Sequence, residues 1–468
     1  MGAGSPFSRG PEPRLKPSGP PGHPLMSPSW LAAQGRLPLA FMGLALAWLV
    51  GATGWLVGEP ELLAMPHMHP QVVALTHAWV LGCFVSVACG AVYQLAPVAL
   101  GTTLANERHG WWHFGLHAAG VPGMVYALRS WDLILLGHAG FAVALGVLLF
   151  SVNTWVTVRR SGRGGTVAWS LGLAAGWLLL TVLLGLLLAA NRFWGFLPLN
   201  PLALLRTHAH LGLVGFFLTL LQGVGLQLVP MFTLGEVRSW RLANLGLALS
   251  QGGLLLLASG LTWALTWLSL PGALAIAAGL GCSGLGLWRA LSARKKRALD
   301  PGIRAFINGC LGVLAANLAA VVLVVPGSPW GSAPGGFGAM VYAVLGLAGG
   351  LLPCIAGMMC KIVPFLVWMR AYGPRVGRGP TPPASGLTRP RLERWGLALQ
   401  GAAVVPLLVG TWLLSEPWLR AGTWLLAVGV ALFVADMLGV LRHLWGASLP
   451  GTTSVSTQAP TARPSPNS

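Results

Sequence analysis

Long apolar runs separated by short polar segments make up most of the chain. Each run is close to the roughly 20 residues that an α-helix needs to cross the hydrocarbon of a bilayer. The pattern predicts twelve membrane-spanning helices, at 38–58, 71–98, 111–128, 133–157, 166–190, 207–233, 241–263, 267–289, 303–325, 337–368, 396–414 and 421–441. We therefore expect an all-α polytopic membrane domain over residues 36–445, between disordered tails at 1–35 and 446–468 that are rich in Pro, Gly and Ser.

The composition excludes a water-soluble domain. Hydrophobic residues make up 55% of the chain and charged residues only 8%, and the mean hydropathy is +0.71. In soluble domains the charged share is about 25%. The lipid bilayer is therefore the predicted surroundings of the chain, and no N-terminal signal peptide is recognised in residues 1–35. All six cysteines lie within predicted spans, which argues against a disulfide framework of the secreted kind.

The net charge is +19, and most of the basic residues lie on one predicted side of the membrane. With a cytoplasmic N-terminus, 24 of the 29 basic residues fall in inner segments, and the outer loops hold Arg129, Arg192, Arg206 and Arg420. Cytoplasmic loops of membrane proteins carry such an excess of Lys and Arg. The asymmetry predicts an inner-membrane protein with both termini cytoplasmic. No nucleic-acid partner is expected, because the basic residues form no single soluble face.

Glycines and rare polar residues recur three times at fixed offsets from a proline. The three prolines are Pro97, Pro230 and Pro364. Three residues before them stand Gln94, Gln227 and Lys361, and seven residues before them stand Gly90, Gly223 and Gly357. Fifteen residues before them stand Gly82, Gly215 and Gly349. Each proline lies in the second helix of a group of four. Glycines at such positions let helices approach closely in lipid. The pattern predicts three pseudo-equivalent four-helix repeats, at about 36–160, 165–290 and 300–445.

Histidines open the second and the sixth predicted helix. Counted back from the prolines, His77 corresponds to His210, and Val344 stands in the third copy. Counted forward from Pro70 in HPQVVALTHA and Pro201 in NPLALLRTHA, His77 corresponds instead to His208. Both registers remain open from sequence. A polar side chain at this depth needs a partner, and neutral imidazole is the commonest metal ligand in proteins.

Twelve helices in three groups of four, with histidines opening the second and sixth, resemble subunit I of the haem-copper oxidase superfamily. The likeness covers roughly residues 36–445 at the level of architecture. It implies that His77 matches a low-spin haem ligand, and that His208 or His210 matches a copper ligand. It also implies an oxidoreductase that reduces oxygen or nitric oxide with electrons from a cytochrome or quinol, among other membrane subunits.

The sequence departs from that family at two helices. The seventh, RLANLGLALSQGGLLLLASG, contains no histidine, and the tenth contains none either. The family's full set of two haems and a three-histidine copper therefore does not carry over. The chain is interpreted as a divergent relative, and whether it is catalytic is left open.

Other polar residues on the predicted outer side extend the candidate site. Haem iron is commonly held by axial histidines, and arginine pairs well with carboxylates. Thioether and imidazole together suit copper. The candidates for cofactor binding are His77, His208, His210, His138, Arg192 and Arg206, and the candidates for copper are His67, His69, Met65 and Met68 in the loop MPHMHP. For each, a lipid headgroup contact or a packing role is the simpler alternative.

The remaining polar residues favour structural roles. His113 and His117, in WWHFGLH, share one helix face, where a hydrogen-bonded packing pair is favoured over a metal site. Lys361 is expected to extend its ammonium towards water near the inner end of its helix. Tyr342 could line the same cavity as His208.

Two further hypotheses stand beside the redox protein. One is a transporter or assembly factor that passes copper or haem across the membrane; the other is a sensor that binds nitric oxide or haem without turnover. Internal repeats and helix breaks also occur in transporters, although there the repeats are often inverted. The expectation of haem and copper therefore depends on the histidines. Whether the purified protein contains a bound cofactor distinguishes the three hypotheses.

Overall fold

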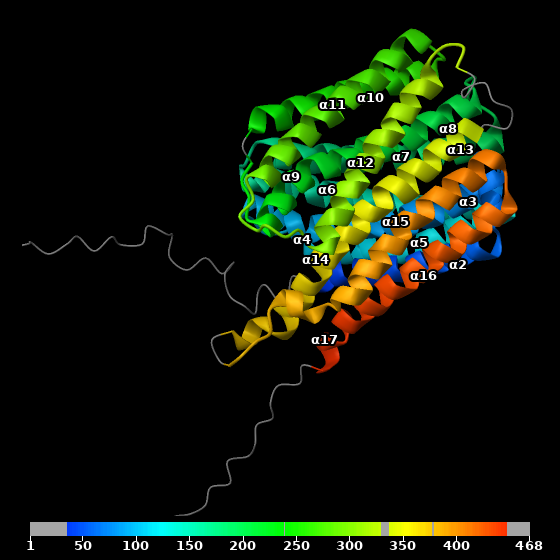
Figure 1. The fold of residues 1–468 in the computed structure, drawn as a ribbon. Coiled ribbons are helices and arrows are strands. Elements are labelled where there is room, and N and C mark those ends of the chain that lie inside the picture. Colours follow the sequence, from blue (N-terminus) through cyan, green and yellow to red (C-terminus); the bar gives the residue numbers. More distant parts are fainter. Residues whose placement is uncertain (1–34, 238, 329–336, 377–378, 447–468) are drawn as a thin grey trace, which may run out of the picture.

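The computed structural model describes residues 35–237, 239–328, 337–376 and 379–446. Within these ranges all regular elements are helices, and the long ones run side by side as one bundle (Figure 1). Apart from Gly35 and Gly446, the two predicted tails lie outside the described residues. The all-α expectation is confirmed for the part of the chain that the structure describes.

The helices follow the predicted order. Their bounds are α2 Arg36–Gly58, α3 Pro70–His77, η3 Ala78–Val85, α4 Ser86–Leu100, α5 Glu107–Ser130, α6 Leu133–Ser161, α7 Thr166–Trp194, α8 Pro201–His210, η4 Leu211–Leu218, α9 Thr219–Thr233, α10 Trp240–Thr262, α11 Thr266–Ser292, α12 Pro301–Val324, α13 Phe337–Val344, η6 Leu345–Leu351, α14 Leu352–Ala371, α15 Pro390–Leu413, α16 Glu416–Leu441 and α17 His443–Gly446. Short 3₁₀ turns lie at Pro60–Ala64, Gly373–Arg375 and Ala384–Leu387.

Eleven helices among the described residues are long and apolar enough to cross a membrane. Three of these are continuous through a change of helix type: α3–η3–α4, α8–η4–α9 and α13–η6–α14. The span expected at 111–128 forms α5, which packs along α6 but is too polar to be counted with the eleven. The structure therefore supports an integral membrane protein with eleven spans by length and composition, and α5 is a further long helix of the same bundle.

The sixth predicted span begins earlier than its apolar run. Residue 207 was the expected start, but α8 begins at Pro201, because proline suits the first helical position and Asn200 caps the helix. The Asn200 side chain accepts hydrogen bonds from the backbone N–H groups of Leu202 and Ala203. His208 and His210 consequently lie two turns inside the helix and not at its start.

The three continuous helices each contain a π-helical segment at the same place. The segments begin at Ala78, Leu211 and Leu345, each 19 residues before a proline inside the following α-helix: Pro97, Pro230 and Pro364. A π segment leaves some carbonyls without their usual partner. In two of these helices a side-chain hydroxyl donates a hydrogen bond to the backbone carbonyl five residues before it. The pairs are Ser86 with Leu81 and Thr219 with Val214.

The recurring glycines lie where two helices approach most closely. A Cβ atom on Gly90 would lie 3.0 Å from the Cβ of Phe41 on α2. One on Gly223 would collide with Ser170 on α7, and one on Gly357 would collide with the backbone of α12. Each of α4, α9 and α14 therefore packs against its neighbour through a glycine that stands seven residues before the proline. This is the small-residue packing expected in lipid.

The bundle has two ends that carry aromatic side chains. One end, here called the outer end to follow the predicted orientation, has the loops around residues 59–69, 131–132, 195–200 and 263–265; the other is the inner end. Tryptophan is enriched at both membrane–water interfaces. Exposed tryptophans lie near the outer end at Trp131, Trp194, Trp263, Trp267, Trp412 and Trp418, and near the inner end at Trp111, Trp112, Trp169, Trp240, Trp288, Trp395 and Trp445.

An ion-pair cluster closes the inner end where α12 and α14 meet. The Lys361 ammonium lies 2.8 Å from Oδ2 of Asp300, and Lys296 lies 3.0 Å from the same oxygen. Lys361 is therefore paired and only 14% exposed, so the expected extension into water is replaced by a salt bridge. Asp436, also embedded, accepts a hydrogen bond from the backbone N–H of Arg389 at the start of α15.

Asp300 gives the fold a pH dependence. Burial alone raises the pKa of its carboxyl, but the hydrogen bonds and charges of Lys361 and Lys296 outweigh burial and lower the pKa below its ordinary value of 3.8. A lowered folded-state pKa stabilises the fold above the unfolded pKa, and this stabilisation is lost as the pH falls through the folded pKa. We expect Asp300→Asn to lower the thermal unfolding midpoint in detergent at about pH 7, and the deficit relative to wild type to shrink as the pH falls through the folded-state pKa of Asp300.

A matched control for Asp300 is Glu416→Gln. The Glu416–Arg420 pair has both side chains more than half exposed, and exposed pairs contribute little. The thermal unfolding midpoint of Glu416→Gln should equal that of the wild-type protein at every pH. An Asp300→Asn deficit that persists unchanged in acid would contradict the ion pair as its cause.

Candidate functional site

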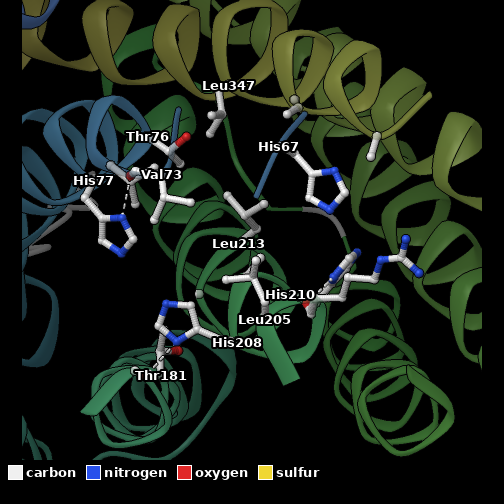
Figure 2. A pocket seen from close by; sticks show the side chains of 18 of the residues that line it. His67, Val73, Thr76, His77, Thr181, Leu205, His208, His210, Leu213 and Leu347 are labelled. Atoms are coloured by element: carbon white, nitrogen blue, oxygen red, sulfur yellow. Dashed lines mark hydrogen bonds between the residues drawn. The ribbon is translucent and has the colours of Figure 1, made fainter. Parts of the chain in front are cut away.

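A cavity of about 830 Å³ lies in the outer half of the bundle. Its walls include α3, α6, α7, α8, α10, α11, α12, α13 and the π segments η3, η4 and η6, and the lining side chains are mostly leucine, valine, alanine and phenylalanine. Seven of the ten candidate residues lie on its wall: His67, Met68, His77, Arg192, Arg206, His208 and His210. Figure 2 shows the four histidines around this space. The fold thus brings together residues that are up to 143 positions apart in the sequence.

His77 and His208 face each other across one part of the cavity. His77 ends α3 and His208 lies on α8, and their ring centres are 6.2 Å apart with the ring planes at 26°. Nδ1 of His77 lies 2.7 Å from the carbonyl oxygen of Val73, one turn earlier. Nδ1 of His208 lies 2.9 Å from the carbonyl oxygen of Thr181 on α7. Both bonds are drawn in Figure 2.

These two carbonyls fix the protonation pattern of the rings. A carbonyl oxygen only accepts, so each Nδ1 must carry a proton and donate it. In a neutral imidazole the other nitrogen, Nε2, is then unprotonated. Metal-binding histidines show this arrangement, in which a backbone carbonyl orients the ring and the second nitrogen keeps its lone pair for the metal. In both His77 and His208 the unprotonated Nε2 is thus left with an available lone pair.

His210 lies on a different side of α8 and has a different partner. Its Nδ1 lies 2.8 Å from the carbonyl oxygen of Arg206. Its Nε2 lies 3.3 Å from the hydroxyl of Tyr342, and the two rings stack with their centres 5.9 Å apart. The Nε2 lone pair is thus engaged by a tyrosine. Tyr342 lines the cavity as expected, and His208, not His210, is the free counterpart of His77.

The loop before α3 reaches the cavity with two of its four candidate residues. His67 and Met68 lie on the cavity wall, whereas Met65 and His69 do not. Both ring nitrogens of His67 and Nδ1 of His69 are buried without a hydrogen-bond partner. Burial, and then the charge of Arg206, lower the pKa of His67, so its ring is neutral near pH 7. His67 is therefore available as a ligand or a hydrogen-bonding group.

Copper binding by this loop stays a prediction. Among the described His, Cys, Asp and Glu side chains, no three lie close enough together to hold a metal ion. His67, His69, Met65 and Met68 are two imidazoles and two thioethers, which suit reduced copper by softness. The structure places only His67 and Met68 of these four on a common wall.

The two arginines of the site belong to helices and not to the outer loop. Arg192 lies in the last turn of α7, and Arg206 lies within α8, because both helices extend beyond their predicted ends. The Arg192 guanidinium lies 5.7 Å from the centre of the Trp131 ring. Both arginines line the cavity near its outer end and are exposed. They place positive charge at the side of the cavity that faces solvent.

His138 is not brought to the other histidines. It lies on the exposed side of α6, and its Nδ1 is 2.8 Å from the carbonyl oxygen of Ile134 in the same helix. It does not line the cavity. The apolar run around it predicted the helix correctly but could not indicate which face of α6 turns outward.

Three contributions to the site carried no sequence signal or were overlooked. The carbonyls of Val73 and Thr181 act through backbone atoms, which no residue pattern reveals. Asn317 on α12 lines the cavity, and its Oδ1 is buried without a partner. Asn317 could have been recognised from the sequence, because it is a polar residue within an apolar run.

Comparison with known proteins adds no assignment. No protein-family model matches the chain, and no curated protein matches it. The functional argument therefore depends on the residues and geometry of the cavity.

Proposed function

We propose that this protein binds haem inside the membrane, that His77 and His208 would hold its iron, and that it acts in electron transport. The observation that carries the proposal is the pair of imidazole rings, held by carbonyls on separate helices, that face each other across an apolar cavity. The resemblance to haem-copper oxidase subunit I extends the proposal to the reduction or binding of oxygen or nitric oxide.

The spacing of the two rings suits one metal ion between them. A metal–imidazole bond is about 2 Å long and a ring centre lies about 1 Å behind its nitrogen, so two imidazoles that held one metal ion between them would have centres about 6 Å apart. The observed separation of 6.2 Å agrees with this value.

The cavity suits a large, mainly apolar group. Its volume of about 830 Å³ is within the range of roughly 300–1,000 Å³ that is typical of ligand pockets. Haem also carries two carboxylates, which require cations or water. Arg192 and Arg206 stand near the outer end of the cavity, where charge-assisted hydrogen bonds with carboxylates are favourable.

The groups around the cavity have separate roles in the proposed function. Haem supplies the one-electron redox chemistry when it is bound. Val73 and Thr181 orient the two imidazoles through their carbonyls, and the apolar wall excludes water, which sets the local dielectric. A haem held between His77 and His208 would be suited to passing electrons. His210 and Tyr342 remain on the opposite side of α8 for a second polar function.

The membrane domain is proposed to consist of three pseudo-equivalent four-helix units. The equal placement of the π segments, each 19 residues before its proline, supports this proposal. So do the glycines at equivalent positions, which pack against α2, α7 and α12, the first helices of the three proposed units. The excess of basic residues at the inner end further supports cytoplasmic termini in the inner membrane.

The proposed function is tested by purifying the full chain in mild detergent. The visible spectrum is recorded oxidised and dithionite-reduced, with iron and copper analysis on the same sample. We expect sharp α and β bands in the reduced state, as six-coordinate haem gives, and iron in a fixed ratio to protein. A colourless, iron-free protein that stays colourless after haem is supplied would overturn the proposal and favour transport or assembly.

A further inference from the structure

His208 differs from the other histidines near the outer end in the partner of its Nδ1 atom. Three of these histidines bond Nδ1 to the carbonyl oxygen four residues earlier in the same helix: His77, His138 and His210. For His208 that carbonyl would belong to Leu204. Its Nδ1 lies instead 2.9 Å from the carbonyl oxygen of Thr181, on the neighbouring helix α7 (Figure 2). The orientation of the His208 ring therefore depends on the packing of α8 against α7.

A glycine on α7 leaves the space that this ring occupies. Gly185 lies one helical turn after Thr181 and therefore on the same face of α7. A Cβ atom on Gly185 would lie 2.9 Å from Cε1 of His208 and 3.5 Å from its Nδ1. The third nearest atom, at 3.9 Å, is Nε2 of the same ring. The imidazole of His208 thus covers the backbone of α7 at the one position of this turn that has no side chain.

A side chain at position 185 would obstruct the carbonyl that holds the ring. Side chains of an α-helix tilt towards its N-terminus, so each covers the turn that precedes it. On α7 the turn before residue 185 carries the carbonyl of Thr181. A carbon contact of 2.9 Å is also well inside the separation of about 3.5–4.0 Å at which carbon atoms pack. Because an imidazole can rotate and the helix backbone cannot, the ring of His208 would be displaced.

A second glycine makes the contact between the two helices reciprocal. Gly212, on η4, stands four residues after His208, and a Cβ atom there would lie 3.3 Å from Cγ2 of Thr181. Each partner of the hydrogen bond is thus followed, four residues later, by a glycine that packs against the other partner. Thr181 is buried, and its Oγ1 donates to the carbonyl of Trp177, 2.7 Å away. The two glycines let α7 approach the α8–η4 helix closely enough for the bond to form.

We propose that Gly185 is a positioning residue, which gives His208 the ring orientation that faces His77. The inference rests on the proposed function for the haem that these two rings would hold. Without the space at Gly185, Nδ1 of His208 would bond to the carbonyl of Leu204 in its own helix, as the other three histidines do. Its ring would then leave the stacked arrangement with His77, in which the ring centres are 6.2 Å apart.

Gly185→Ala in the full chain tests this inference by two measurements. The first is a structure of the haem-free variant in lipid nanodiscs, in which we expect Nδ1 of His208 to have left the carbonyl of Thr181 for that of Leu204. The second is a haem titration with spectra in both redox states. The affinity for haem should fall by about 10–100-fold, the range found when a group that orients a metal ligand is removed. The sharp bands of six-coordinate haem should weaken with it.

Gly176→Ala is the matched control on the same helix. A Cβ atom there would lie 3.5 Å from Cζ2 of Trp155, which is an ordinary van der Waals contact. Both substitutions raise helix propensity equally, and both glycines are partly buried, so only the contact with His208 differs. Gly176→Ala should keep the wild-type spectrum and haem affinity. The thermal unfolding midpoints of both variants should stay close to that of wild type, because at Gly185 a side chain moves and the backbone stays in place.

Two results would overturn the positioning role. In one, His208 keeps its bond to Thr181 in Gly185→Ala; in the other, the ring moves but the haem affinity and spectrum remain those of wild type. A lower unfolding midpoint with unchanged haem affinity would likewise show that Gly185 serves packing alone. The fate of the proposed function is read separately, from wild-type protein. If wild type binds no haem, the proposed function fails, whereas a ring that moves in Gly185→Ala and not in Gly176→Ala still assigns the orientation of His208 to Gly185.

Discussion

Alanine in place of either His77 or His208 is expected to abolish the six-coordinate haem spectrum. Each substitution removes one of the two imidazoles that face each other at 6.2 Å. Haem affinity should fall by at least about 10–100-fold, the range found when only a supporting partner of a metal ligand is removed. The measurement is a haem titration of the purified variants, with spectra in both redox states. Any haem that remains should show the broad bands of five-coordinate iron.

His138→Ala and His210→Ala are the matched controls. His138 lies on the exposed side of α6 and has an Nδ1-to-carbonyl bond like those of His77 and His208, and His210 has its Nε2 bonded to Tyr342. Both variants should keep the sharp six-coordinate bands. Loss of these bands in His210→Ala, with an intact spectrum in His208→Ala, would assign the second ligand to His210 and contradict the pairing.

Gly253→Val is expected to prevent stable packing of α10 against α11. A Cβ atom on Gly253 would lie 2.7 Å from the carbonyl oxygen of Gly272 and 2.9 Å from the backbone nitrogen of Ile276. Backbone atoms cannot rotate away, so the helices must separate. Helix association in lipid depends on this close packing, and overpacking costs about 1–3 kcal/mol or more. We expect a lower unfolding midpoint and a lower yield of monodisperse protein in detergent.

The neighbouring residue provides the control for Gly253. Gly252 lies on the exposed side of the same helix, and a Cβ atom there would have no other atom within 4 Å. Gly252→Val changes helix propensity in the same way without affecting the interface, so it should stay close to wild type. Equal losses in the two variants would mean that propensity, and not the contact with α11, determines the stability of this hairpin.

The fold was predictable to the extent that it follows from apolar runs. Eleven of the predicted spans have counterparts among the helices that can cross a membrane, because a lipid environment forces each span to satisfy its backbone within a helix. The differences lie at the helix ends and in the polarity of α5. Asn200 and Pro201 start α8 six residues before the predicted residue 207, and α5 is a bundle helix whose polar residues face other helices, as His113 and His117 do.

The sequence predicted which histidines belong to the candidate site but not which of them face each other. The pattern identified His77 and both His208 and His210, and the two registers could not choose between the last two. In an α-helix two residues apart means about 200° of rotation, so only one of them can face His77. The packing of α8 turns His208 towards His77 and His210 towards Tyr342.

The sequence by itself determined that this protein is an all-helical membrane protein, where most of its spans lie, and which histidines lie near the outer end. These properties depend on the transfer of side chains and backbone from water to lipid, which is local to each segment. Only the tertiary structure decided which histidines meet, which carbonyls orient them, and that His113 and His117 are buried between α2, α4 and α6. Such contacts join α3 to α8 and α5 to η3, and they depend on how the helices rotate and pack, which no single segment encodes.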